Sequence, residues 1–138
     1  MYHNTLAWIL SLAGLLPVIA TCVWAYYQGV DSQIMLVVLQ YLGIIQAFLA
    51  GTSWAFSLSS PQFAWGLVYA VSFALLPWFA SMQSIFIRLI LACVGFIGLL
   101  IFDYLLLRKQ VISTWYFSLR VLITIIMITL LLLIMALI

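Results

Sequence analysis

The sequence predicts an all-α fold, a compact bundle of five transmembrane helices in a polytopic integral membrane protein. Of the 138 residues, 70% are hydrophobic, and the mean hydropathy is +1.40, whereas soluble domains are about 45–50% apolar. Only 4% of the residues are charged. The apolar residues form continuous runs of about 20, which is the length of a helix that crosses a bilayer. Transmembrane β-strands would alternate in polarity, and these runs do not.

All five spans are expected to form a single transmembrane domain over residues 1–138. Each backbone N–H and C=O in hydrocarbon must be bonded within its own segment, so every span is expected to be helical. The connections between the runs are short, which leaves no room for a soluble domain. The spans cover residues 6–26, 34–57, 63–79, 85–107 and 118–138.

The first span, residues 6–26, contains Pro17. Proline removes a helical hydrogen bond, so a kink near Gly14 is expected. No Lys or Arg precedes the span, and tyrosines rather than small residues follow it. We therefore expect a retained helix and not a cleaved signal peptide.

Small residues recur at every fourth position of the second span, residues 34–57, and form a stripe on one side of the helix. Small side chains let two helices approach closely in a membrane. We expect another helix of the same protomer to lie there, with a partner subunit as the alternative. Gln40 and Gln46 add groups for interhelical hydrogen bonds. The stripe consists of Gly43, Ala47, Gly51 and Ala55.

The third and fifth spans are continuous apolar runs. Residues 63–79 contain no charged side chain, and polar connections at 59–62 and 80–84 bound them. Residues 118–138 contain one charge, Arg120, close to the start of the span. Both segments are therefore expected to be simple membrane-crossing helices.

The fourth span, residues 85–107, contains both Arg88 and Asp103. Fifteen residues of helix separate them by about 22 Å, so they cannot touch. Both lie close to an interface, so we expect structural ion pairs: Arg88 with Asp31, unless it extends outward to the interface, and Asp103 with a basic residue near the next connection. A proton-coupling role for Asp103 is the alternative. Small residues mark a close-packing surface between the two charges, namely Ala92, Gly95 and Gly98.

Positive charge predicts the orientation. Arg108, Lys109 and Arg120 flank the connection between the fourth and fifth spans, and short cytoplasmic loops retain Lys and Arg. With five spans, the N-terminus is then expected to be cytoplasmic and the C-terminus periplasmic. The expected location is the bacterial inner membrane.

Motifs for catalysis or cofactor binding are not apparent. His3 is the only histidine, and Cys22 and Cys93 are not spaced as metal ligands. No HExxH or Gly-rich phosphate loop occurs, so we expect no enzyme activity and no cofactor, although a bound phospholipid is compatible with the sequence. The net charge of +2 is too small and scattered for nucleic-acid binding. The surrounding partners are expected to be membrane lipids.

Several short motifs resemble a known family. They are residues 10–17 (LSLAGLLP), 41–43 (YLG), 50–54 (AGTSW), and 115–116 (WY) with 119–120 (LR) and Thr124. Together they resemble the domain-of-unknown-function 3429 family of bacterial membrane proteins, which is related to mitochondrial transmembrane protein 69. The resemblance implies a small polytopic inner-membrane protein and no established activity.

Two functional interpretations follow from these observations. The first is a non-catalytic accessory or assembly subunit that packs against a larger inner-membrane complex, such as a respiratory one. The alternative is a small oligomeric carrier or channel that uses Asp103 as a coupling carboxylate and Arg88 as a gate. An enzyme that acts on a lipid or quinone would need a polar pocket that opens sideways into the bilayer.

Overall fold

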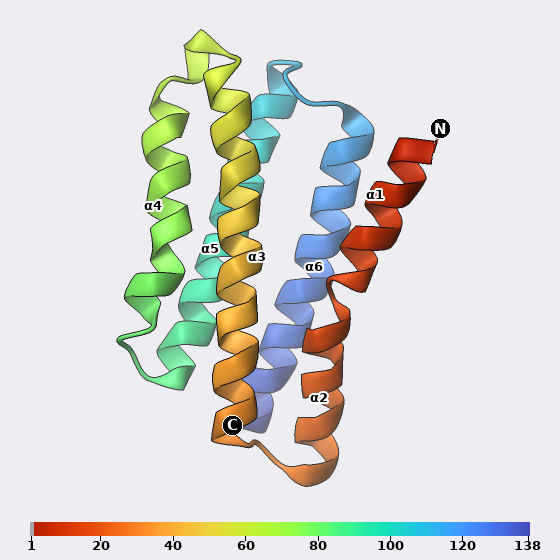
Figure 1. The fold of residues 1–138 in the computed structure, drawn as a ribbon, viewed down its shortest axis with the longest axis vertical. Helices are drawn as coiled ribbons and strands as arrows, with labels where there is room; N and C mark the ends of the chain where they lie inside the picture. Colours follow the sequence, from red (N-terminus) through yellow and green to blue (C-terminus); the bar gives the residue numbers. More distant parts are fainter. Residues whose placement is uncertain (1) are drawn as a thin grey trace.

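Helices account for nearly all of the described chain, and residues 2–138 contain no β-strand (Figure 1). The computed structural model describes the backbone of residues 2–138 and the side chains from residue 4 onward, so the His3 side chain lies outside the described part. In chain order, the elements are α1 (Tyr2–Ala13), α2 (Leu16–Gln28), α3 (Ser32–Leu58), the 3-10 turn η1 (Pro61–Phe63), α4 (Trp65–Ala80), α5 (Ile85–Arg108) and α6 (Thr114–Leu137).

Four segments are long and apolar enough to cross a membrane. One is the continuous run Asn4–Gln28, in which α1 and α2 follow each other, and the others are α3, α5 and α6. The fifth, α4, is apolar but has only 16 residues. The structure therefore confirms the all-α, multi-pass membrane fold.

The helices run along the long axis of the molecule, and the connections gather at its two ends (Figure 1). The N-terminus, the α3–α4 connection and the α5–α6 connection lie at one end. The α2–α3 connection, the α4–α5 connection and the C-terminus lie at the other. Exposed Arg108 and Lys109 are at the same end as the N-terminus.

The expected break in the first span occurs at Gly14 and Leu15, just before Pro17 in the first turn of α2. In an unbroken helix the Gly14 carbonyl would accept from Val18 N–H. Val18 N–H donates to Leu15 O instead, at 3.1 Å. The Tyr41 hydroxyl on α3 donates to the freed Gly14 carbonyl at 2.7 Å, so a side chain of α3 holds the break in place.

A second proline, Pro77, lies inside α4 and frees another carbonyl. Proline has no N–H, so Phe73 O loses its partner four residues on. The side-chain amide of Gln46, which is only 1% exposed, donates to Phe73 O at 2.9 Å. The Pro77 ring packs directly on Gly43, where a Cβ would lie 2.9 Å from Pro77 Cβ. Residues of α3 therefore compensate both proline sites.

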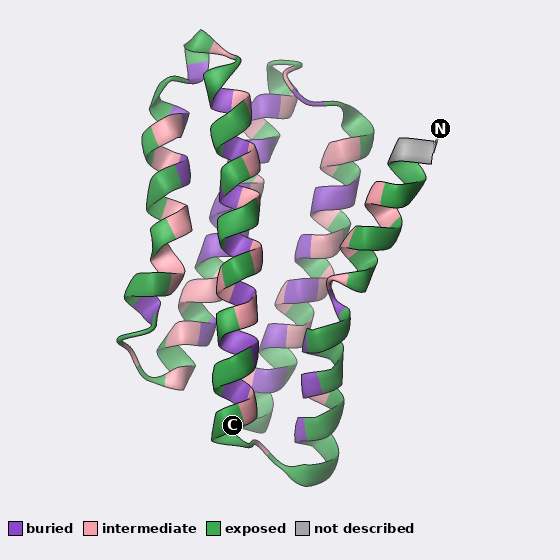
Figure 2. Cartoon of the chain, in the orientation of Figure 1, coloured by how far each residue is buried: buried purple, intermediate pink, exposed green. Residues whose placement is uncertain are grey.

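Buried residues lie mainly on the helix sides that face the other helices, and exposed residues lie mainly on the outer sides (Figure 2). One buried cluster joins α2, α3, α5 and α6 through residues such as Val18, Leu42 and Met127. A second, around Phe63 and Phe102, lies near the α3–α4 and α5–α6 connections. Large exposed apolar side chains cover the outside, as lipid contact requires and as soluble monomers avoid.

Candidate partner interface

The small-residue stripe of α3 is divided between two environments. Gly43 lies against Pro77 inside the protomer, whereas Ala47, Gly51 and Ala55 are exposed. Helix α4 packs on the adjacent face of α3, which carries Gly43, Gln46, Ala50, Ser53 and Ser57. The structure therefore places no helix of this protomer over most of the predicted stripe.

The exposed part of the stripe belongs to a continuous outward surface, which we call the outer α3 face: Ile44, Ala47, Phe48, Gly51 and Ala55. At 100° per residue these five positions span about 100° of the helix circumference. Phe48 is 69% exposed, and a Cβ added at Gly51 would have no neighbouring atom within 4 Å. The face therefore combines small residues with larger apolar ones and is open to the outside.

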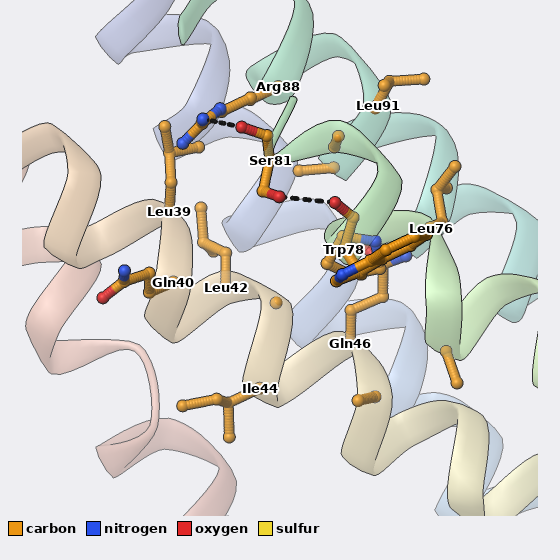
Figure 3. Close-up of a pocket in the computed structure, with 16 residues that line it drawn as sticks. Leu39, Gln40, Leu42, Ile44, Gln46, Leu76, Trp78, Ser81, Arg88 and Leu91 are labelled. Atoms are coloured by element: carbon orange, nitrogen blue, oxygen red, sulfur yellow. Dashed lines mark hydrogen bonds between the residues drawn. The ribbon is translucent and has the colours of Figure 1, made fainter. Parts of the chain in front are cut away.

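A cavity of about 490 Å³ adjoins this face between α3, α4 and α5 (Figure 3). Ile44 and Ala47 of the outer α3 face also line the cavity. Most of its other lining side chains are aliphatic, and Gln40, Gln46, Trp78, Ser81 and Arg88 supply polar groups. A side chain from a helix docked on α3 would therefore find room beside Ala47.

Arg88 lies at the end of this cavity (Figure 3). Its guanidinium donates hydrogen bonds to two backbone carbonyls just after the carboxyl end of α4. Its Nε donates to Gln83 O at 3.0 Å, and its Nη2 donates to Ser81 O. A cation is favourable at the negative end of a helix dipole. The expected contact with Asp31 does not form among the described residues, because Asp31 instead caps α3 and accepts from Gln33 N at 2.7 Å.

The small residues of α5 pack within the protomer. Gly95 and Gly98 are buried, and Ala92 is half-buried beside the cavity. A Cβ at Gly95 would collide with the Gln46 amide, and one at Gly98 would collide with the Phe73 ring. Gly95 therefore makes room for the Gln46 amide that bonds Phe73 O, and Gly98 makes room for the Phe73 ring.

Asp103 forms a buried ion pair with Arg120, one of the three basic residues considered from the sequence. Arg120 Nε donates to Asp103 Oδ2 at 2.6 Å, and their side chains are 5% and 0% exposed. Asp103 Oδ1 and Arg120 Nη2 have no partner within the described chain. Arg108 and Lys109 remain exposed at the end of α5. The pair joins α5 to α6 inside the bundle.

The two residues of the carrier alternative occupy separate environments. Arg88 lines the cavity between α3, α4 and α5, and Asp103 does not. Arg120 lines a second cavity, between α1, α3 and α6, and Asp103 does not line that cavity either.

Cys22 and Cys93 are half-buried free thiols. In the part of the chain that the structure describes, no three His, Cys, Asp or Glu residues are grouped as a metal site would need.

Sequence reasoning did not identify Tyr41 or Phe73 as important, although a signal for both was present. Each proline removes an N–H and frees the carbonyl near it. Buried polar atoms need partners, so Pro77 predicts that a side chain from a neighbouring helix reaches Phe73 O. The helix break expected from Pro17 likewise predicts a free carbonyl near residue 14 that needs an outside donor. The fold is needed to identify Tyr41 and Gln46 as the donors.

One comparison with known proteins identifies a family. A family model described as a protein of unknown function, DUF3429, matches residues 3–137. No match was found among curated proteins or among solved structures.

Proposed function

The chain belongs to the DUF3429 family, a family of unknown function, and we propose that it is a non-catalytic accessory or assembly subunit that packs against a larger inner-membrane complex, such as a respiratory one. The observation that carries this proposal is the outer α3 face. Ala47, Gly51 and Ala55 are spaced for close helix–helix contact, yet no helix of this protomer covers them.

The chemistry of this face fits a transmembrane helix as its partner. Lipid tails are as apolar as leucine side chains, so helix association in a bilayer depends on close van der Waals packing. Small residues four apart allow two backbones to approach, and the flanking Ile44 and Phe48 provide apolar walls. The adjoining cavity would admit one side chain of the partner.

The charged groups support a structural role within the protomer. Arg88 is engaged by backbone carbonyls, and Asp103 is engaged by Arg120. For the orientation, we propose that the N-terminus is cytoplasmic and the C-terminus periplasmic in a bacterial inner membrane. The exposed Arg108 and Lys109 support this because short cytoplasmic loops retain basic residues.

Purification in mild detergent from native membranes tests the proposal. We expect a membrane partner in stoichiometric amount with the wild-type chain and its loss with Gly51→Leu. A Cβ at residue 51 meets no atom of its own protomer within 4 Å, and the position is exposed, so we expect the variant to keep its melting temperature. Ala20→Leu, at an exposed small residue of α2, is the matched control and should retain the partner.

Two results would contradict the proposal. One is purification of this chain alone under conditions that preserve known membrane complexes. The other is a partner that stays bound equally well to the wild type and to folded Gly51→Leu, since the outer α3 face would then not be the contact surface.

A further inference from the structure

Arg88 is the only charged residue among the described residues that line the cavity between α3, α4 and α5. The volume of this cavity, about 490 Å³, falls within the range of about 300–1,000 Å³ typical of small-molecule sites. The cavity opens on the outer surface of the bundle, since Ile44 and Trp78 of its lining are 67% and 65% exposed. The proposed subunit role uses only the room beside Ala47 and does not involve the end at Arg88.

The cavity extends from one end of the bundle toward the apolar middle of the membrane. Arg88 lies in the first turn of α5, beside the α4–α5 connection (Figure 1). The 24 residues of α5 correspond to about 36 Å of helix, so its first turn is expected near the head groups that bound a hydrocarbon core of about 30 Å. On α3 the lining runs from Leu39 to Ala47, about 12 Å toward the middle of that helix. A site of this shape suits an amphiphile.

The chain supplies no acidic partner for Arg88 within the described residues. Asp31 and Asp103 are the two acidic residues of the sequence. Asp103 is bound to Arg120 inside the bundle, Asp31 caps α3, and neither lines the cavity. Basic side chains near a membrane surface attract anionic lipids. The charge of Arg88 is therefore available to an anion from outside the chain.

The guanidinium of Arg88 also keeps hydrogen-bond donors free. Arginine carries five N–H donors, and the bonds to Gln83 O and Ser81 O use Nε and Nη2. Nη1 makes no hydrogen bond within the described chain and, unlike Nη2 of Arg120, is not a buried atom. The negative end of the α4 dipole amounts to about half an elementary charge, so this end of the cavity stays net positive.

The head group that fits this end is an anionic phosphate. Phosphate oxygens accept charge-assisted hydrogen bonds from arginine, and the negative charge neutralises Arg88. A zwitterionic head group would also bring an ammonium, for which the described lining has no acidic side chain. The exposed Trp78 of the lining is of the kind that gathers at the lipid–water boundary.

We propose that this cavity binds one anionic phospholipid. Its phosphate accepts from Arg88 beside Ser81, and an acyl chain extends into the cavity against Leu42 and Leu91. The lipid site does not depend on the partner subunit, because Gly51 does not line the cavity. Gly51→Leu should therefore lose the partner and keep the lipid, which separates a failure of one proposal from a failure of the other.

Native mass spectrometry of the whole protein in mild detergent tests the lipid site. Three probes carry the same two oleoyl chains: phosphatidylglycerol, phosphatidylethanolamine and diacylglycerol. A fourth, glycerol phosphate, has the phosphate without the chains. We expect one saturable phosphatidylglycerol per protein, bound about tenfold more tightly than phosphatidylethanolamine, and no saturable binding of the other two probes.

Two pairs of variants with matched charge changes locate the site. Arg88→Gln should weaken phosphatidylglycerol binding about tenfold, whereas Arg108→Gln, at the exposed opposite end of α5, should not. Ser81→Asp keeps the backbone carbonyl that Arg88 binds and adds a carboxylate beside the guanidinium, so it should also weaken this lipid. Ser59→Asp is the control, because Ser59 and Ser81 are exposed C-cap residues of α3 and α4.

The proposal is overturned if phosphatidylglycerol does not bind saturably, or if the two members of each pair weaken its binding alike. The anionic head group is overturned if phosphatidylethanolamine or diacylglycerol binds as tightly as phosphatidylglycerol. A lipid as the occupant is overturned if glycerol phosphate binds as tightly. Should Arg88→Gln fail to fold, the serine pair and the comparison of head groups still decide.

Discussion

The side-chain amide of Gln46 on α3 donates a 2.9 Å hydrogen bond to the backbone carbonyl of Phe73 on α4. This carbonyl is available because residue 77 is proline and has no N–H to donate. A hydrogen bond between α3 and α4 therefore replaces the hydrogen bond that α4 lacks at Pro77.

Gln46→Met is expected to lower the free energy of unfolding by about 1–3 kcal/mol, because it leaves the buried Phe73 carbonyl without a partner. In a Pro77→Ala background residue 77 regains its N–H, so the cost of Gln46→Met should fall by at least half. Thermal or denaturant unfolding in detergent measures both. Gln40→Met, at an exposed glutamine of the same helix, is the control. Equal costs in the two backgrounds would contradict this coupling.

Two glycines that pack between helices, Gly95 and Gly98, and the exposed Gly51 should respond differently to alanine. Gly95→Ala and Gly98→Ala should each cost about 1–3 kcal/mol, because the new methyl group meets Gln46 or Phe73. Gly51→Ala should leave the stability unchanged or raise it by up to about 1 kcal/mol, since the methyl group meets open space and alanine favours helix. The melting temperatures of the three variants should therefore be lower for Gly95→Ala and Gly98→Ala than for Gly51→Ala. A destabilised Gly51→Ala would argue against the exposure of this position.

Removing one member of the Asp103–Arg120 pair should destabilise the protein more than removing both. Asp103→Leu strands a buried guanidinium at a cost of about 3–5 kcal/mol. The double variant Asp103→Leu/Arg120→Met should recover most of this loss, because apolar side chains of similar volume replace a buried pair well. A double-mutant cycle on unfolding energies measures the difference. Arg108→Met, at an exposed site, should change stability by less than about 0.5 kcal/mol.

Tyr41→Phe should loosen the break between α1 and α2, since it removes the hydrogen bond to Gly14 O. Such bonds in membrane proteins contribute about 0.6 kcal/mol on average, so the melting temperature should change little. Hydrogen exchange should accelerate at residues 14–18, where the backbone bonds are irregular. Tyr26→Phe, at an exposed tyrosine of α2, should leave exchange there unchanged, and a uniform change along the chain would contradict a local role for Tyr41.

The sequence was sufficient to predict the helices. Continuous apolar runs dictate where they lie, because the backbone in lipid has no alternative to helix. The kink near Gly14 could be predicted for the same kind of reason, since Pro17 cannot donate a hydrogen bond.

The packing could not be predicted in the same way. Small or weakly polar residues on α3 recur on two adjacent faces, so their spacing alone does not say which face α4 covers. Pro77 determines which face α4 covers, because it leaves Phe73 O without a donor inside α4. Gln46 has a side-chain amide that can donate to this carbonyl, and Ala47 does not. Likewise the sequence offers three cations near Asp103, and only the placement of α6 brings Arg120 within 2.6 Å.

Helix α4 has only 16 residues, which corresponds to about 24 Å of helix against a hydrocarbon thickness of about 30 Å. The longer helices are long enough for the full thickness, and we expect the bilayer beside α4 to thin, or its head groups to dip toward the ends of this helix. Arg88, at the carboxyl end of α4, is placed to meet such lowered phosphates. The protein is therefore expected to deform its membrane on one side only, next to the outer α3 face, and thinner bilayers should accommodate it at lower cost.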